Sequence, residues 1–169
     1  MKSIHGKSIL VIDDDAAMLR ALGKVLSSEG AVVATASWVG ELMERLAEKQ
    51  GSVDLIITDI RMPVMDGRSI LGAVKAALPE VPVIVITAFA TPEARTECEA
   101  AGAADFLEKP LDTPQLLAAI ERALSRGAPH PGRPGRRLWG LRKAKALTQA
   151  NETDLFPGSE LAGKVGSPP

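Results

Sequence analysis

Hydrophobic positions along residues 1–126 follow two patterns that alternate five times. Short runs rich in β-branched residues cover residues 8–13, 31–36, 55–59, 82–87 and 105–109. Three of these runs are almost entirely apolar, which is typical of parallel strands buried on both faces of a sheet. We therefore predict five strands.

Longer segments between these runs carry apolar residues at helical spacing. These positions are Met18, Leu19, Leu22, Val25 and Leu26 in the first segment, Leu42, Met43 and Leu46 in the second, Ile70, Leu71, Val74, Ala77 and Leu78 in the third, and Leu116, Leu117 and Ile120 in the fifth. The fourth segment begins at Thr91-Pro92, a typical helix start, and offers only Ala94, Cys98 and Ala101 as apolar positions. We therefore expect the fourth helix to be the least firmly docked.

Alternation of strands and helices predicts an α/β domain with a parallel sheet, right-handed crossovers and helices on both faces. Five such units favour a flavodoxin-like doubly wound fold of the form (βα)5. Sheets of this kind bind ligands beyond the carboxyl ends of their strands. The residues that follow each apolar run are therefore the first candidates for a functional site.

The predicted strand ends are rich in polar side chains. They carry Asp13, Asp14 and Asp15 at the first run, Asp59 at the third, Thr87 at the fourth and Lys109 at the fifth. Clustered carboxylates repel one another unless a proton or a cation lies between them. Mg²⁺ suits such a cluster, because it binds a few carboxylate oxygens and keeps several water ligands.

Each of these residues also has an ordinary structural explanation. Asp15 is suited to cap the helix that follows it, and Asp59 to a turn before Pro63. Thr87 is a common strand residue, and a lysine such as Lys109 is usually solvated. A functional site accounts for all four strand ends together, whereas the structural explanations require four coincidences at one edge of one sheet.

Composition adds constraints on the class of protein. The chain is 46% hydrophobic and 24% charged, as globular proteins are. Its single cysteine, Cys98, excludes an internal disulfide and a zinc site built on a cysteine pair. No segment approaches the roughly 18 consecutive apolar residues that indicate a membrane-spanning helix. We therefore expect a cytoplasmic protein.

Charge divides the chain into two parts. Residues 1–126 hold 13 Lys/Arg and 18 Asp/Glu, net −5, whereas residues 127–169 hold 7 and 3, net +4. The second part also contains 7 Gly and 6 Pro in 43 positions, a low-complexity composition. We predict a domain over 1–126 and a mostly disordered basic tail over 127–169, which is too short to form a helix-turn-helix output domain with its own core.

Four motifs connect the predicted strand ends to a known family. They are ILVIDDD at 9–15, LIITDIRMPVMDG at 55–67, VIVITAF at 83–89 and AADFLEKP at 103–110. In this order and spacing, residues 7–125 resemble the receiver domain of two-component response regulators. A phosphatase of the haloacid dehalogenase kind would need an acid two residues after Asp59, where this chain has Arg61.

The resemblance implies a signalling switch rather than a metabolic enzyme. A histidine kinase or histidine phosphotransfer protein would phosphorylate Asp59, while Lys109 and Thr87 would each bind a phosphoryl oxygen. The implied ligands of Mg²⁺ are Asp13, Asp14, Asp59 and the backbone carbonyl of Arg61.

The resemblance also implies how the signal leaves the site. Thr87 would move toward the phosphoryl group, and the ring of Phe106 would fill the space it vacates; plain core filling is the alternative for this ring. The surface formed by the fourth helix, fifth strand and fifth helix would then bind a downstream protein or a second copy of the chain. Arg61 and Phe89 flank the path of attacking water in this family, and because both are bulky we predict a long-lived phosphoryl state.

The tail supplies an alternative function. Residues 133–145 carry six cationic side chains and no acid, and Leu138, Leu141 and Leu147 are spaced to share a helical face over about 137–149. Such a segment could bind nucleic acid, an anionic surface or the acidic receiver part itself, although a solvated tail is the simpler interpretation. A truncated transcriptional regulator is a further alternative.

Overall fold

A central sheet of five parallel strands organises the structure. The computed structural model describes residues 4–38, 40–41, 53–62 and 65–126. The strands are β1 (Ser8–Ile12), β2 (Val32–Ala36), β3 (Leu55–Asp59), β6 (Val83–Thr87) and β7 (Asp105–Glu108), in the spatial order β2-β1-β3-β6-β7. The strand order reverses at β1, as the doubly wound prediction requires.

The strands match the predicted runs to within one residue at each end. Their apolar composition explains the match, because every residue of β3 and β6 is buried. The edge strands are less buried, since β2 buries only Ala36 and β7 buries only Phe106 and Leu107. All strand pairs in this sheet are parallel, and their register places Asp59 opposite Ile86 and Thr87 opposite Glu108.

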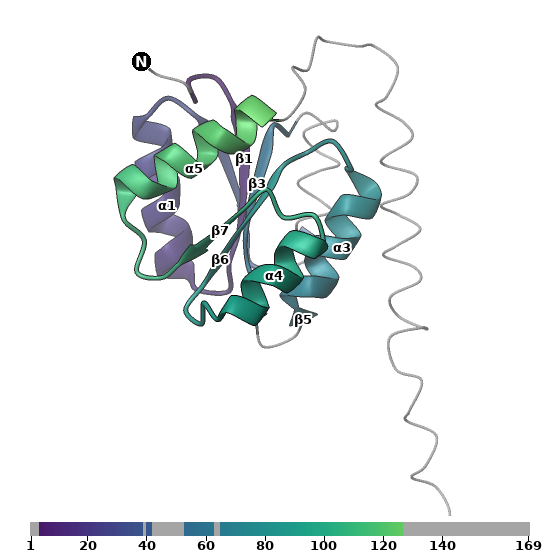
Figure 1. Ribbon diagram of the computed structural model, residues 1–169. Coiled ribbons are helices and arrows are strands. Elements are labelled where there is room, and N and C mark those ends of the chain that lie inside the picture. Colours follow the sequence, from purple (N-terminus) through teal and green to yellow (C-terminus); the bar gives the residue numbers. More distant parts are fainter. Residues whose placement is uncertain (1–3, 39, 42–52, 63–64, 127–169) are drawn as a thin grey trace, which may run out of the picture.

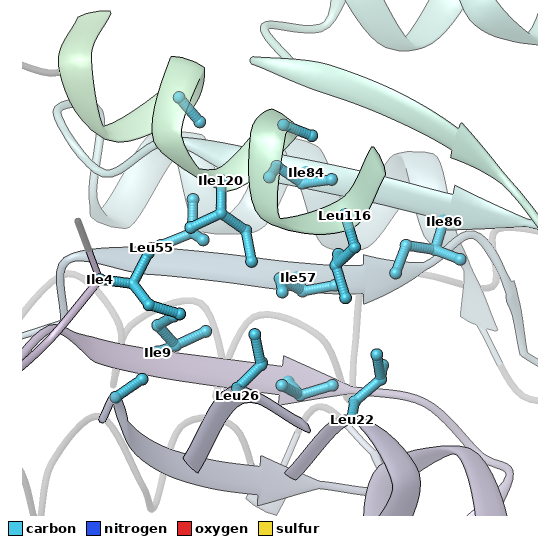
Figure 2. Close-up of a cluster of buried hydrophobic side chains, with 14 of the residues drawn as sticks. Ile4, Ile9, Leu22, Leu26, Leu55, Ile57, Ile84, Ile86, Leu116 and Ile120 are labelled. Atoms are coloured by element: carbon cyan, nitrogen blue, oxygen red, sulfur yellow. The ribbon is translucent and has the colours of Figure 1, made fainter. Parts of the chain in front are cut away.

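Helices cover both faces of the sheet (Figure 1). α1 (Ala16–Ser28) and α5 (Thr113–Arg126) pack on one face, and α3 (Gly67–Ala77) and α4 (Pro92–Ala100) pack on the other. Figure 2 shows the first core, where Leu22 and Leu26 of α1 and Leu116 and Ile120 of α5 meet strand residues such as Ile57. The predicted fold is therefore confirmed over the described residues.

Polar caps fix where two of the helices begin. Asp15 accepts hydrogen bonds from the backbone N–H groups of Ala17 and Met18, which confirms its capping role at α1. Thr91 accepts from the N–H of Ala94 at the start of α4, with Pro92 in the first turn. Both helices thus start at the carboxyl edge of the sheet, where the polar strand ends lie.

α4 is weakly anchored, as its sequence predicts. Cys98 is its only buried residue, and Ala94 adds a partly buried contact. A second feature near the site has no counterpart in the prediction: residues Arg61–Met62 (β4) and Met65–Asp66 (β5) form a short antiparallel pair directly after β3.

Some predicted segments lie outside the described residues. They include most of the second helix, with Leu42, Met43 and Leu46, and the tail 127–169 with its expected helix near 137–149. Among the described residues, no helix is long and apolar enough to cross a membrane.

Candidate functional site

Four neighbouring strands deliver polar side chains to one point. Asp13 follows β1, Asp59 ends β3, Thr87 ends β6 and Lys109 follows β7. Asp13, Asp59 and Thr87 are among the few buried polar residues, with exposed fractions of 2%, 6% and 0%. Since burying such groups costs free energy unless they are paired, their shared position points to a site and not to chance.

Lys109 links the two buried carboxylates. Its Nζ lies 2.7 Å from Oδ2 of Asp13 and 2.6 Å from Oδ2 of Asp59, and donates a hydrogen bond to each. Lys109 is 96 positions from Asp13 and 50 positions from Asp59 along the chain, so it is the sheet topology that brings them together. One ammonium group is therefore shared between two carboxylates.

Burial and pairing act in opposite directions on this lysine. Burial alone lowers the pKa of the Lys109 ammonium, because desolvation disfavours the charged form. The hydrogen bonds and charges of Asp13 and Asp59 outweigh burial, so the pKa is raised above 10.5. Lys109 is consequently a fixed positive charge at neutral pH.

The carboxylates form a cluster that suits a small hard cation. Oxygen atoms of Asp13, Asp14 and Asp59 lie within 4.8 Å of one another, and Asp14 is exposed while the other two are buried. Oxygen donors on one side and access for water on the other are what Mg²⁺ requires. Asp13 Oδ1 also accepts from the N–H of Asp15, which holds the Asp13 side chain in place.

Thr87 lies at the end of β6 with its hydroxyl oxygen already engaged. Its Oγ1 accepts from the backbone N–H of Phe89 at 3.1 Å, and its carbonyl accepts from the N–H of Lys109 at 2.8 Å. The second bond joins the Thr87 and Lys109 strand ends directly. The first bond ties the threonine side chain to the loop that leads into α4.

Arg61 and Phe89 meet beside the Asp59 carboxylate. The backbone N–H of Arg61 donates to Oδ1 of Asp59 at 2.7 Å, and its guanidinium Cζ lies 4.2 Å from the centroid of the Phe89 ring. Phe89 is 57% exposed, so the pair lies at the surface. Cation–π contact explains why an exposed phenylalanine takes this position.

Comparison with known proteins identifies the family. The response regulator receiver domain profile matches residues 9–121. The chain belongs to the response regulator receiver family. It is 37% identical over 117 residues to the DNA-binding transcriptional regulator NtrC of Escherichia coli K12, a match that covers 69% of this chain and 24% of NtrC. The chain therefore corresponds to only about a quarter of that relative's length.

Solved structures agree with the receiver assignment. The beryllofluoride-activated NtrC4 receiver domain dimer is 30% identical, with a TM-score of 0.65 over 74% of this chain and 98% of that chain. The CheX–CheY complex with beryllofluoride and magnesium from Borrelia burgdorferi is 27% identical, with a TM-score of 0.64 over 69% of this chain and 87% of that chain.

A second guanidinium, that of Arg95, contacts Phe106. Phe106 is 1% exposed and belongs to the core cluster on the α3 and α4 face, as the core-filling interpretation predicts. Arg95 of α4 places its Cζ 4.9 Å from the Phe106 ring centroid and donates from Nη2 to the Phe106 carbonyl at 3.2 Å. Glu99, one turn further along α4, lies 3.8 Å from the Arg95 guanidinium. A switching role for Phe106 remains a prediction.

Sequence reasoning found the receiver's polar cluster but missed its cross-links. The shared lysine and the contacts of Arg61 with Phe89 and of Arg95 with Phe106 were not predicted. For Arg61 and Phe89 the available signal was that both are expected to flank the path of attacking water, which places them near each other without specifying a contact. For Arg95 and Phe106 the sequence offered no comparable signal. The carbonyl of Arg61 as a Mg²⁺ ligand stays a prediction, although the bond to Asp59 keeps that residue beside the cluster.

Proposed function

We propose that this receiver accepts a phosphoryl group on Asp59 from a histidine kinase or a histidine phosphotransfer protein. The observation that carries the proposal is the Lys109 ammonium placed 2.6 Å from Asp59 Oδ2, with Asp13 on its other side. A partly buried lysine between two acids supplies positive charge where a transferring phosphoryl group develops negative charge.

The transfer itself is a displacement at phosphorus. A carboxylate oxygen of Asp59 forms a bond to phosphorus while the phosphorus–nitrogen bond of the donor phosphohistidine breaks. The electron pair of that bond stays on the imidazole nitrogen, and the ring leaves neutral because its other nitrogen carries a proton in the donor phosphohistidine. Lys109 neutralises one phosphoryl oxygen, and the hydroxyl of Thr87 donates to another.

The cluster of Asp13, Asp14 and Asp59 fits Mg²⁺, and the backbone carbonyl of Arg61 would complete the protein ligands. When bound, the ion screens the carboxylates and stabilises charge on the phosphoryl oxygens. Asp14 is exposed, so solvent has access on that side of the cluster.

Output would pass through the surface formed by α4, β7 and α5. Movement of Thr87 toward the phosphoryl group withdraws its oxygen from the Phe89 N–H and changes the space around Phe106. α4 responds readily because Cys98 is its only buried residue. A downstream protein or a second copy of the chain would bind this surface, and the NtrC4 receiver supports pairing because it forms a dimer when activated.

We place the protein in the cytoplasm, where its single cysteine, Cys98, would stay reduced. The division into a receiver over 1–126 and a basic tail over 127–169 is part of the same proposal. Binding of nucleic acid or an anionic surface through residues 133–145 is the less favoured alternative, since the family match lies within residues 9–121. A transcriptional output, the role named for NtrC, belongs with these alternatives.

Phosphorylation can be tested directly on the full chain. The protein is incubated with acetyl phosphate and Mg²⁺, and its intact mass is followed with and without hydroxylamine, which cleaves acyl phosphates. We expect one phosphoryl group per chain that hydroxylamine removes. The Asp59→Asn variant should gain none.

A matched variant guards against a general effect of losing a carboxylate. Asp54→Asn removes an aspartate that contacts Ser8 and Lys7 and that precedes β3. This variant should be phosphorylated as the unmodified chain is. Phosphorylation that persists in Asp59→Asn and disappears in Asp54→Asn would contradict the proposed acceptor.

A further inference from the structure

A closed ring of contacts begins and ends at Asp59, the proposed acceptor. Asp59 accepts from the N–H of Arg61, whose guanidinium lies over Phe89. The N–H of Phe89 donates to the hydroxyl oxygen of Thr87, and the carbonyl of Thr87 accepts from the N–H of Lys109. The Nζ of Lys109 donates to Asp59 and closes the ring. Four of these five links involve hydrogen bonds, so the link between Arg61 and Phe89 is the weakest in kind.

The Phe89 end of this link leads directly to α4. The carbonyl of Phe89 accepts from the N–H of Thr91 at 3.2 Å, and Thr91 is the N-cap of α4. Phe89 thus bonds Thr87 through its N–H and the α4 cap through its carbonyl. Whatever holds the Phe89 ring therefore restrains both the threonine hydroxyl and the start of the helix.

A guanidinium prefers a phosphoryl oxygen to an aromatic face. An exposed cation–π contact is weak, whereas hydrogen bonds from arginine to phosphate are charge-assisted and can be bidentate. The Arg61 backbone is already hydrogen-bonded to Asp59, so its flexible side chain starts beside any group attached there. Lys109 offers a point charge on the other side, and its Nζ is shared between two carboxylates.

We propose that Arg61 senses the phosphoryl group. In the unmodified receiver its guanidinium contacts the Phe89 ring. When Asp59 carries a phosphoryl group, the guanidinium leaves Phe89 to bind a phosphoryl oxygen, and this releases the loop that leads into α4. This inference rests on the proposed phosphorylation of Asp59. It gives the receiver a route from the acceptor to α4 through Arg61 and Phe89, separate from the packing of Phe106.

Competition between the two positions of Arg61 predicts effects of opposite sign. Beryllofluoride with Mg²⁺ serves as the probe of the phosphoryl state, and its affinity is measured on the full chain by amide NMR titration. Phe89→Leu removes the aromatic face but keeps the backbone N–H and apolar bulk, so it should tighten binding about two- to fivefold. Arg61→Gln removes the charge and should weaken binding about fivefold or more.

The double variant separates competition from independent effects. In the Arg61→Gln background, Phe89→Leu should change the affinity by less than about twofold, because no guanidinium remains to be held. The Nε–H signal of Arg61 should show a ring-current shift in the unmodified chain that disappears on adding beryllofluoride and is absent in Phe89→Leu. Arg126→Gln, which removes an exposed arginine at the end of α5, should leave the affinity unchanged.

The outcomes distinguish failure of the inference from failure of the proposed function. If the unmodified chain binds beryllofluoride but both variants shift the affinity in the same direction, or neither shifts it, Arg61 does not sense the phosphoryl group. If the unmodified chain binds no better than Asp59→Asn, the phosphorylation of Asp59 itself is wrong. Dispersed amide spectra for every variant establish that each one folds.

Discussion

Removing the shared ammonium should destabilise the receiver strongly. In Lys109→Met, an apolar chain of similar length replaces the lysine, which leaves Asp13 and Asp59 buried without their partner. Breaking a buried ion pair in this way costs about 3–5 kcal/mol. We therefore expect the free energy of unfolding at pH 7, without divalent ions, to fall by this amount.

Repulsion between the remaining carboxylates supports the magnitude. Their oxygens lie within 4.8 Å of one another. Two unit charges at that distance, with an effective dielectric constant of about 20, repel by ~3.5 kcal/mol. The second variant Lys109→Met/Asp13→Asn removes one of the two charges and should recover most of the loss.

Urea unfolding followed by far-UV circular dichroism measures these differences. With a slope of about 2 kcal/mol per molar urea, the midpoint of Lys109→Met should fall by ~1.5–2.5 M. Mg²⁺ should raise the midpoint of Lys109→Met more than that of the unmodified chain, because no ammonium competes for the carboxylates. An unchanged midpoint in Lys109→Met, or no recovery in the double variant, would refute the electrostatic reasoning.

Three further predictions concern the side chains around the acceptor. Replacing Arg61 and Phe89 together by alanine should shorten the lifetime of the phosphoryl group several-fold, because in-line attack by water needs an open approach. The decay of the phosphorylated species is followed by intact mass, and an unchanged decay rate would contradict this. Arg95→Ala removes the contacts with Phe106, so it should speed hydrogen exchange across α4 and lower the free energy of unfolding by about 1–2 kcal/mol. Arg95→Lys should give exchange rates and a stability between those of Arg95→Ala and the unmodified chain. The pKa of Lys109 is raised in the folded chain, so the stability that its charge contributes is complete below pH 10.5 and is lost as the pH rises through the folded pKa. Lys109→Arg keeps its charge and should therefore lose less stability over about pH 10–12, as measured by urea unfolding.

The fold was predictable because its signals are local. Buried parallel strands such as β3 and β6 begin with a run of apolar residues and end at a polar one, Asp59 in β3 and Thr87 in β6, so their ends can be located in the sequence. The caps at Asp15 and Thr91 are equally local, since each involves neighbours two or three residues away. The pair β4 and β5 was missed, because two-residue strands have no periodicity to detect.

The site was predictable only as a set of residues. Parallel strands carry their carboxyl ends to one edge, so Asp13, Asp59, Thr87 and Lys109 had to be near one another. Which atoms pair depends on side-chain conformation and on neighbours that are distant along the chain. The shared contacts of Lys109 span 96 and 50 positions and leave no pattern in the sequence.

The contacts that the sequence did not predict have a common chemistry. Each is a guanidinium against a phenylalanine ring: Arg61 on Phe89 and Arg95 on Phe106. The first lies where α4 begins, and the second ties α4 to β7. Cys98 is the only buried residue of α4, so these two contacts and the Thr91 cap add polar and aromatic restraints to a sparse apolar attachment. We therefore expect a change in charge at Asp59 to alter the helix without disturbing the apolar core.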